Sequence, residues 1–202
     1  MSGSEATPKT LPNGLPDVHR YITTHNQSGK AIFTPEIPPS AKWQDIGGAF
    51  KFFLGYTTHK FPASLKPSDG KDEGSTPEDI VSYKRDLENP GGLAISGGTV
   101  CRFVDFSPGS EPVMHRTTSL DYGVVLEGSM ECILDSGEVQ RMNRGDVCVQ
   151  RATNHAWRNV TENNGWARMM FVLTGSEAPV VAGKTLGEDL GQQMPEAVKK
   201  SD

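Results

Sequence analysis

The stretch MHRTTSLDYGVVLEG, residues 114–128, combines a strand-like pattern with residues that transfer protons or bind metals. Side chains alternate between two faces along a β-strand, so Asp121 and Gly123 share one face while their neighbours share the other. His115 and Thr117 have the same parity as Asp121 and are expected to face the same interior. The stretch therefore predicts one wall of a β-barrel that carries polar groups on its inner side.

A second stretch, GDVCVQRATNHAWRN (residues 145–159), follows some 30 residues later and contains His155 after an apolar run. A hairpin between the two stretches would place His155 across from His115. Two neutral imidazoles and the carboxylate of Asp121 on one wall would form a facial set of three ligands for a divalent metal. The same three groups without a metal would suit general acid–base catalysis.

The composition favours an all-β fold. The chain has 202 residues, of which 35 % are hydrophobic, and it contains 22 glycines and 14 prolines but few aromatic residues. From residue 93 to residue 174, short apolar runs alternate with turn signals such as Pro-Gly, Glu-Gly and Ser-Gly. Short strands at this spacing predict an antiparallel barrel or sandwich rather than a helical bundle.

The pattern along the chain predicts a single barrel domain, residues 17–175, between two polar ends. Residues 1–16 are polar and proline-rich and are expected to form a flexible leader, and residues 176–202 to form a polar tail. Residues 59–92 are a polar insertion with one short helix, for which Thr76 is the expected N-cap. This insertion is expected to be either a functional flap or a solvated linker.

The charge balance excludes one class of partner. The formal net charge is −5 and no cluster of basic residues is present, so no nucleic acid is expected to bind. No apolar run approaches the length of a membrane span, so no membrane partner is expected either. The ligand is expected to be a small and largely neutral molecule.

Cysteine usage indicates the compartment. The three cysteines, Cys101, Cys132 and Cys148, lie in separate apolar runs and form no CxxC pair, so each is expected to be a small buried hydrophobe. The first residues contain no apolar core of a signal peptide. A cytoplasmic location with reduced thiols is therefore expected.

Residues 108–128 and 145–159 resemble the two sequence motifs of the cupin superfamily. The positions that fit the first motif in register are Gly109, His115, Asp121 and Gly128. The positions that match the second are Gly145, Asp146, His155 and Asn159, with one residue fewer before the histidine and Arg151 in place of the usual proline. The amino-acid sequences of both stretches are similar to those of single-domain cupins of bacteria and fungi, and fungal cupins of this kind often belong to natural-product pathways. The resemblance implies a cupin (RmlC-like) antiparallel β-barrel, also described as a double-stranded jelly roll, and a homodimer.

Two departures from the cupin motifs concern metal binding. Thr117 stands where the second histidine of the first motif is usual, and Asp121 is shorter than the usual glutamate. A threonine hydroxyl is a poor ligand for transition metals. Two alternatives follow: His115, Asp121 and His155 hold one divalent metal (Zn, Fe, Mn or Ni), or the site works without a metal.

Three functional hypotheses follow from these residues and from the resemblance, which implies the polyketide-like class of substrate. The first is a lyase or isomerase that uses acid–base or Lewis-acid chemistry to dehydrate, cyclise or decarboxylate a carbonyl-containing, polyketide-like secondary metabolite. The second is an Fe-dependent dioxygenase, since two histidines and one carboxylate are its usual ligands. The third is a barrel that binds a small ligand without catalysis.

The hypotheses share one set of candidate residues. The expected catalytic residues are His115, Asp121 and His155, and the expected substrate-binding residues are Thr117, Gln150, Trp157 and Arg102. Each has a purely structural alternative. The histidines can be satisfied interior residues, the carboxylate can accept backbone N–H bonds at a strand start, and Trp157 can serve barrel packing alone.

Overall fold

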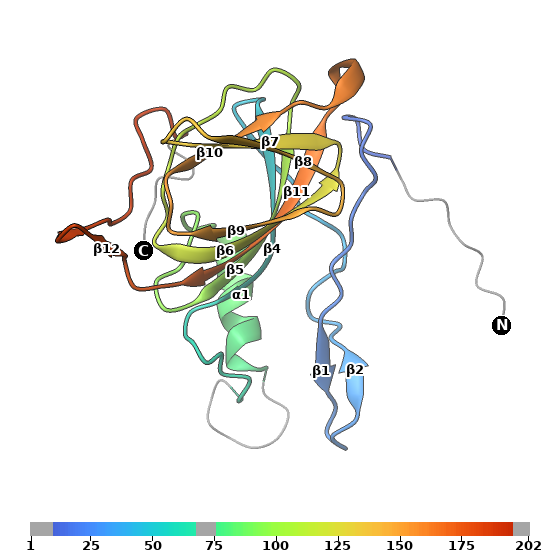
Figure 1. The fold of residues 1–202 in the computed structure, drawn as a ribbon. Coiled ribbons are helices and arrows are strands. Elements are labelled where there is room, and N and C mark those ends of the chain that lie inside the picture. Colours follow the sequence, from blue (N-terminus) through green and yellow to red (C-terminus); the bar gives the residue numbers. More distant parts are fainter. Residues whose placement is uncertain (1–9, 68–75, 196–202) are drawn as a thin grey trace.

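Two antiparallel sheets face each other and enclose the interior of the protein (Figure 1). The computed structural model describes residues 10–67 and 76–195. The larger sheet has the strand order β3-β4-β5-β11-β6-β9 and the smaller one the order β10-β7-β8. This arrangement confirms the predicted all-β jelly roll.

The elements have the following bounds. The larger sheet contains β3 (Gln44–Ile46), β4 (Phe50–Thr58), β5 (Thr99–Phe106), β11 (Ala167–Gly175), β6 (Ser119–Glu127) and β9 (Val147–Arg151). The smaller sheet contains β10 (His155–Asn159), β7 (Ser129–Leu134) and β8 (Val139–Asn143). The remaining elements are the hairpin strands β1 (Thr23–His25) and β2 (Ala31–Phe33), the helix α1 (Glu78–Glu88), the 3-10 turn η1 (Glu162–Asn164), and β12 (Val180–Val181) with β13 (Lys184–Thr185).

Strand β6 shows the predicted alternation of faces. Asp121, Gly123 and Val125 are buried, whereas Tyr122 between them is exposed. Gly123 lies opposite Phe171 of β11, and a Cβ atom at Gly123 would come within 2.9 Å of the Phe171 ring. The absence of a side chain at this position therefore gives the Phe171 ring its place in the interior.

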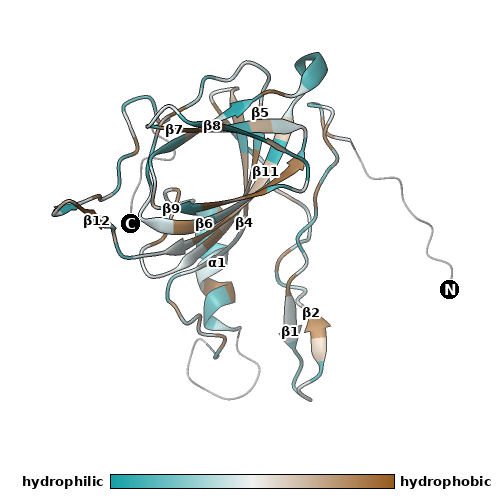
Figure 2. Ribbon diagram, in the orientation of Figure 1, coloured by the Kyte–Doolittle hydropathy of each residue, from teal (hydrophilic) through white to brown (hydrophobic). Residues whose placement is uncertain are grey.

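The core between the sheets is built from the inward faces of both. Phe50 and Phe106 meet edge to face with ring centroids 5.6 Å apart. The buried members of this cluster are Val104, Phe106, Val125, Met130, Cys132, Met142, Trp157, Ala167 and Met169. Hydrophobic residues gather on strands such as β11, whereas the connecting loops are mostly hydrophilic (Figure 2).

Helix α1 packs against β4 and brings a second apolar cluster with it (Figure 1). Tyr83 is fully buried there and donates its hydroxyl to the carbonyl of Leu54 at 2.8 Å. The sequence predicted this helix, but Thr76 is not its cap: the Thr76 hydroxyl donates to Glu36, and the helix begins after Pro77. Residues 68–75 of the predicted insertion lie outside the described residues.

The end of the expected flexible leader contacts the barrel. From Thr10 to Pro16 the chain lies against the large sheet, with Leu15 buried and the Asn13 amide donating to Asp105 at 2.8 Å. Residues 10–16 therefore differ from the expected flexible leader. Their contacts are made by a few individual side chains, which the average composition of the segment does not reveal. Residues 1–9 lie outside the described residues.

A fully buried ion pair lies beneath this N-terminal segment. The Arg168 guanidinium donates to both oxygens of Asp105, at 2.6 and 2.8 Å, and also to the carbonyl of Pro16 at 2.5 Å. The ring of Trp43 covers it at 4.7 Å. Every part of this charged group thus has a partner, as burial of a charge requires.

No helix in residues 10–67 and 76–195 is long and apolar enough to cross a membrane. The expected homodimer stays a prediction.

We predict that Asp105→Asn destabilises the fold by about 3–5 kcal/mol, because it leaves the buried Arg168 without its anion. Urea unfolding followed by tryptophan fluorescence measures this change. The control is Lys60→Met, which breaks an exposed pair with Glu78 and should cost less than about 1 kcal/mol. Equal losses in the two variants would contradict this assignment.

Candidate active site

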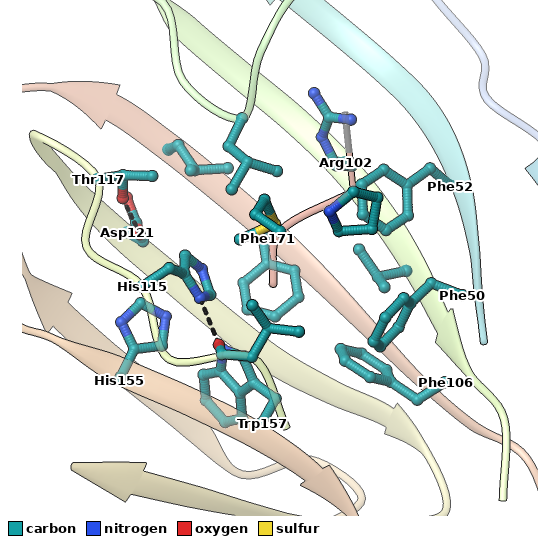
Figure 3. Close-up of a pocket in the computed structure, with 16 residues that line it drawn as sticks. Phe50, Phe52, Arg102, Phe106, His115, Thr117, Asp121, His155, Trp157 and Phe171 are labelled. Carbon is teal, nitrogen blue, oxygen red and sulfur yellow. Dashed lines mark hydrogen bonds between the residues drawn. The ribbon is translucent and has the colours of Figure 1, made fainter. Parts of the chain in front are cut away.

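A cavity that is open to solvent on one side lies between the two sheets. Its walls are largely aromatic and aliphatic, and its polar lining comprises Arg102, His115, Thr117, Asp121 and His155 (Figure 3). The cavity thus contains six of the seven site residues predicted from the sequence, with Trp157 as the sixth.

The two histidines lie side by side, as predicted. The backbone N–H of each donates to the carbonyl of the other at 2.9 Å, which joins the segment before β6 to the start of β10. Their ring centroids are 4.5 Å apart with an angle of 48° between the planes. A ligand in the cavity therefore meets both imidazoles on one wall (Figure 3).

Backbone carbonyls fix the tautomer of both rings. The Nδ1 atom of His115 lies 2.9 Å from the carbonyl of Val113, and Nδ1 of His155 lies 2.9 Å from the carbonyl of Thr153. A carbonyl only accepts, so Nδ1 carries the hydrogen in both rings. In the neutral state the lone pair of Nε2 is then left for a ligand.

Burial keeps both imidazoles neutral. Desolvation lowers the pKa of His115, and desolvation together with the neighbouring His115 lowers the pKa of His155 to about 4. At neutral pH the site therefore offers two uncharged imidazoles.

Asp121 faces the same cavity in a different state. Burial raises its pKa to about 6, and the hydroxyls of Ser119 and Thr117 limit the rise. The Thr117 hydroxyl is 3.4 Å from Oδ2, and Ser119 donates to the Thr117 hydroxyl at 2.8 Å. Oδ1 is buried and has no partner, so one carboxyl oxygen is available to a ligand.

Aromatic residues complete the pocket. The Trp157 ring contacts His155 edge to face, with centroids 5.8 Å apart, and Phe171 at 5.6 Å. Sequence reasoning missed Phe50 and Phe52 as lining residues, although their two-residue spacing in FKFF was the available signal. It also missed Met194 and Pro195, which come from the expected polar tail and had no apolar pattern around them.

The C-terminal segment is held across the barrel by backbone bonds. The backbone of Arg116 pairs with that of Asp189 at 2.6 and 2.8 Å, and the Arg116 Nε donates to the carbonyl of Gly187 at 2.7 Å. Met194 is buried against the cavity as a result. Residues 196–202 of the predicted tail lie outside the described residues.

Gln150, predicted to bind substrate, does not line the cavity. It is buried, but its amide nitrogen lies 3.2 Å from the Cys132 sulfur and 3.5 Å from that of Cys148, and the Thr153 hydroxyl donates to its oxygen at 2.5 Å. These contacts occupy the side chain. Asn159 has a structural role, since its amide donates to the carbonyls of Phe106 and Gly165.

The three predicted metal ligands are not gathered into a ligand set. Among the described residues, no group of three or more His, Cys, Asp or Glu side chains is arranged to hold a metal ion. The two imidazoles are close together, whereas the Asp121 carboxyl is paired toward Thr117. This arrangement does not fit a metal bound by His115, Asp121 and His155. The expected metal stays a prediction.

Comparison with known proteins shows relatives over nearly the whole chain. "Oryzines biosynthesis cluster protein J" of Aspergillus oryzae is 42% identical over 178 residues, which are 88% of this chain and 94% of that protein. "Cupin-domain-containing oxidoreductase fogC" of Aspergillus ruber is 38% identical over 180 residues, 88% of this chain and 82% of that protein. The chain belongs to the cupin family.

This cupin is also similar to a second fungal protein and, at low identity, to a solved structure. "Phomopsin biosynthesis cluster protein C'" of Diaporthe leptostromiformis is 43% identical over 87% of this chain and 88% of its own length. Among solved structures, an RmlC-like cupin from Shewanella frigidimarina aligns with 67% of this chain and 85% of its own, at 14% identity and a TM-score of 0.43. No family model matches the chain.

We predict that the His155 ring stays neutral down to about pH 4, because its burial disfavours the imidazolium. Below pH 6.5 the unfolded chain then binds a proton that the folded cupin does not, so His155 contributes a loss of stability as the pH falls from 6.5 toward 4. Ring ¹⁵N shifts followed from pH 3.5 to 8 measure the titration. The same histidine in urea, expected near 6.5, is the reference. A folded value at or above 6.5 would contradict the prediction.

Proposed function

We propose that this cupin is an enzyme of secondary metabolism that moves a proton on a small apolar carbonyl compound. The observation that carries the proposal is the pair of neutral imidazoles whose Nδ1 atoms are anchored to carbonyls and whose Nε2 atoms are left for a ligand. A base must be unprotonated and held in place before the substrate arrives, and both conditions are met here.

The proposed first step is removal of a proton from a carbon next to the carbonyl group. Nε2 of His115 or His155 takes the proton, and the C–H electron pair moves into the carbonyl to give an enolate. The imidazolium so formed shares the wall with a second, neutral imidazole. A positioned base of this kind typically contributes about 10²–10⁴-fold to the rate.

Asp121 is the proposed second proton carrier. Its pKa of about 6 means that it is protonated below that pH and ionised above it, so it can both donate and accept near neutrality. Its unpaired Oδ1 is the atom available to the substrate. Return of a proton to another carbon gives an isomer, while protonation of a leaving hydroxyl gives dehydration.

Relatives support the biological setting. Proteins named for oryzine and phomopsin biosynthesis clusters share 42% and 43% of their aligned residues with this chain. A cavity with aromatic walls fits a carbonyl-bearing metabolite of such a pathway better than a sugar or a nucleotide. Lyase or isomerase chemistry is our proposal and goes beyond those names.

Oxidoreductase chemistry is the second candidate, because several relatives are named cupin-domain-containing oxidoreductases. A dioxygenase of this kind would need iron held at His115 and His155 with a further ligand. The side chains are not arranged as such a set. We therefore assign the polar residues of the cavity to proton transfer by the side chains themselves.

We predict that the purified cupin exchanges hydrogen on its metabolite. The gene is deleted in the organism that carries it, and the metabolite that accumulates is incubated with the cupin in D₂O. Deuterium uptake with unchanged formula or loss of water or CO₂ is expected, and His155→Gln and Asp121→Asn should slow it about 10²-fold or more. Tyr122→Phe, a change on the exposed outer face of β6, is the control. Gain of oxygen would favour the dioxygenase, and no change in the metabolite would favour the binding protein.

We predict further that activity does not depend on added iron. The cupin is purified without added metal, analysed for metal content and assayed before and after treatment with a chelator. Proton transfer by the side chains alone should survive the treatment. Stoichiometric iron that is lost in both His115→Ala and His155→Ala, together with oxygen consumption, would contradict our proposal and support the second candidate.

A further inference from the structure

Arg102 places a buried cation in the same cavity, apart from the histidines. It lies on β5 with the inward parity of Val104 and Phe106, and only 5% of it is exposed. Figure 3 shows it beside Phe52, with Phe171 between it and the two histidines in that view. A ligand that fills the cavity can therefore contact Arg102 and the histidine pair with different parts of its structure.

The guanidinium is only partly satisfied by the protein. One nitrogen donates to the carbonyl of Gly92 at 2.7 Å, and the Phe52 ring lies 5.1 Å from its central carbon. The Nε atom is buried and has no hydrogen-bond partner. Within residues 10–67 and 76–195 no carboxylate forms an ion pair with Arg102.

The other deeply buried arginine provides a contrast within the same chain. Arg168 has both oxygens of Asp105, a backbone carbonyl and an aromatic ring around its guanidinium. That is how this fold accommodates an arginine whose role is structural. Arg102 has the aromatic ring and one carbonyl but no anion, so its surroundings are complete only when something else supplies the negative charge.

Arg102 keeps its charge despite burial. Desolvation lowers its pKa to about 10, which leaves the group protonated at neutral pH. A buried cation without a counter-ion is unfavourable, and a guanidinium pairs best with a planar group that has two oxygens. On the cavity side the neighbours of Arg102 are aromatic, namely Phe52 and Phe171. Arg102 also borders a second, more polar pocket, in which the Asp86 carboxylate is paired with His59 rather than with Arg102.

We propose that the ligand of this cavity is an apolar carboxylic acid, whose carboxylate pairs with Arg102 while its apolar body lies against the aromatic walls. This rests on the proposed function, because it places the reacting carbon of the same molecule at the histidine pair. A single cation matches a single carboxylate, whereas a phosphate monoester would bring up to two negative charges. From the net charge we expected a largely neutral ligand, and an acid differs from that expectation. The net charge describes the whole chain and does not report the charge of the interior residue Arg102.

Calorimetric titration with simple probes tests the proposal. Octanoate, decanoate and 3-phenylpropanoate are compared with their methyl esters and with octyl phosphate on the full-length protein. At least one acid should bind at least about tenfold more tightly than its ester. Arg102→Met should weaken binding of that acid about tenfold or more and leave ester binding unchanged.

Folding of the variant is checked separately. Arg102→Met removes a charge that has no anion, so its melting temperature should equal or exceed that of the wild type. Arg168→Met leaves Asp105 unpaired and should melt at a lower temperature. The preference of the wild type for acid over ester needs no variant, so it tests the proposal even if Arg102→Met fails to fold.

The outcomes separate this proposal from the proposed function. His155→Gln should retain acid binding within about twofold while it loses hydrogen exchange. Equal binding of acid and ester, no binding by any acid of the panel, tighter binding of octyl phosphate, or acid binding unchanged in a folded Arg102→Met each overturns the carboxylate assignment. None of these results changes the exchange assay, which tests proton transfer by itself.

Discussion

The reciprocal backbone hydrogen bonds between His115 and His155 hold the site of this cupin together. They connect the segment that enters β6 in the larger sheet with β10 in the smaller one. Because the bonds are made by the backbone, the two side chains must leave the paired segments next to each other, and their rings lie 4.5 Å apart. The carbonyls of Val113 and Thr153 then fix each ring through Nδ1. The same backbone pairing thus connects the two sheets and places the two proposed bases next to each other.

The apolar lining determines the charge of every polar group in the cavity. Desolvation favours the neutral form of each group, so it lowers the pKa of the histidines and raises the pKa of Asp121. Arginine is the exception, because its pKa starts too high for burial to neutralise it. The same walls therefore yield neutral bases, a carboxyl that titrates near pH 6 and one persistent cation. That distribution suits a ligand that is apolar along its length and charged at one end.

Sequence reasoning predicted the parts of the site that follow from local periodicity and motif spacing. Parity along residues 115–125 placed Thr117 and Asp121 inside, and the spacing of the second stretch placed His155 opposite His115. Gln150 has the correct parity as well, yet it lies outside the cavity because Thr153 and two cysteine sulfurs occupy its amide. Parity tells which face a side chain leaves from, and neighbours from other strands decide what it reaches.

The ends of the chain show why the remaining parts could not be predicted. Met194 joins the cavity because the backbone of Asp189 pairs with that of Arg116, and the exposed Pro16 contacts the barrel through its carbonyl, which accepts a hydrogen bond from Arg168. Each contact is made by a few polar groups within a segment whose average composition is that of a loop. The relatives share most of their length with this chain, so the barrel is common to them, while chemistry depends on the few residues that line it. Under the carboxylate proposal, we expect a relative with an apolar residue in place of Arg102 to keep the fold and accept a different class of ligand, because among the described residues that line the cavity Arg102 is the one persistent cation.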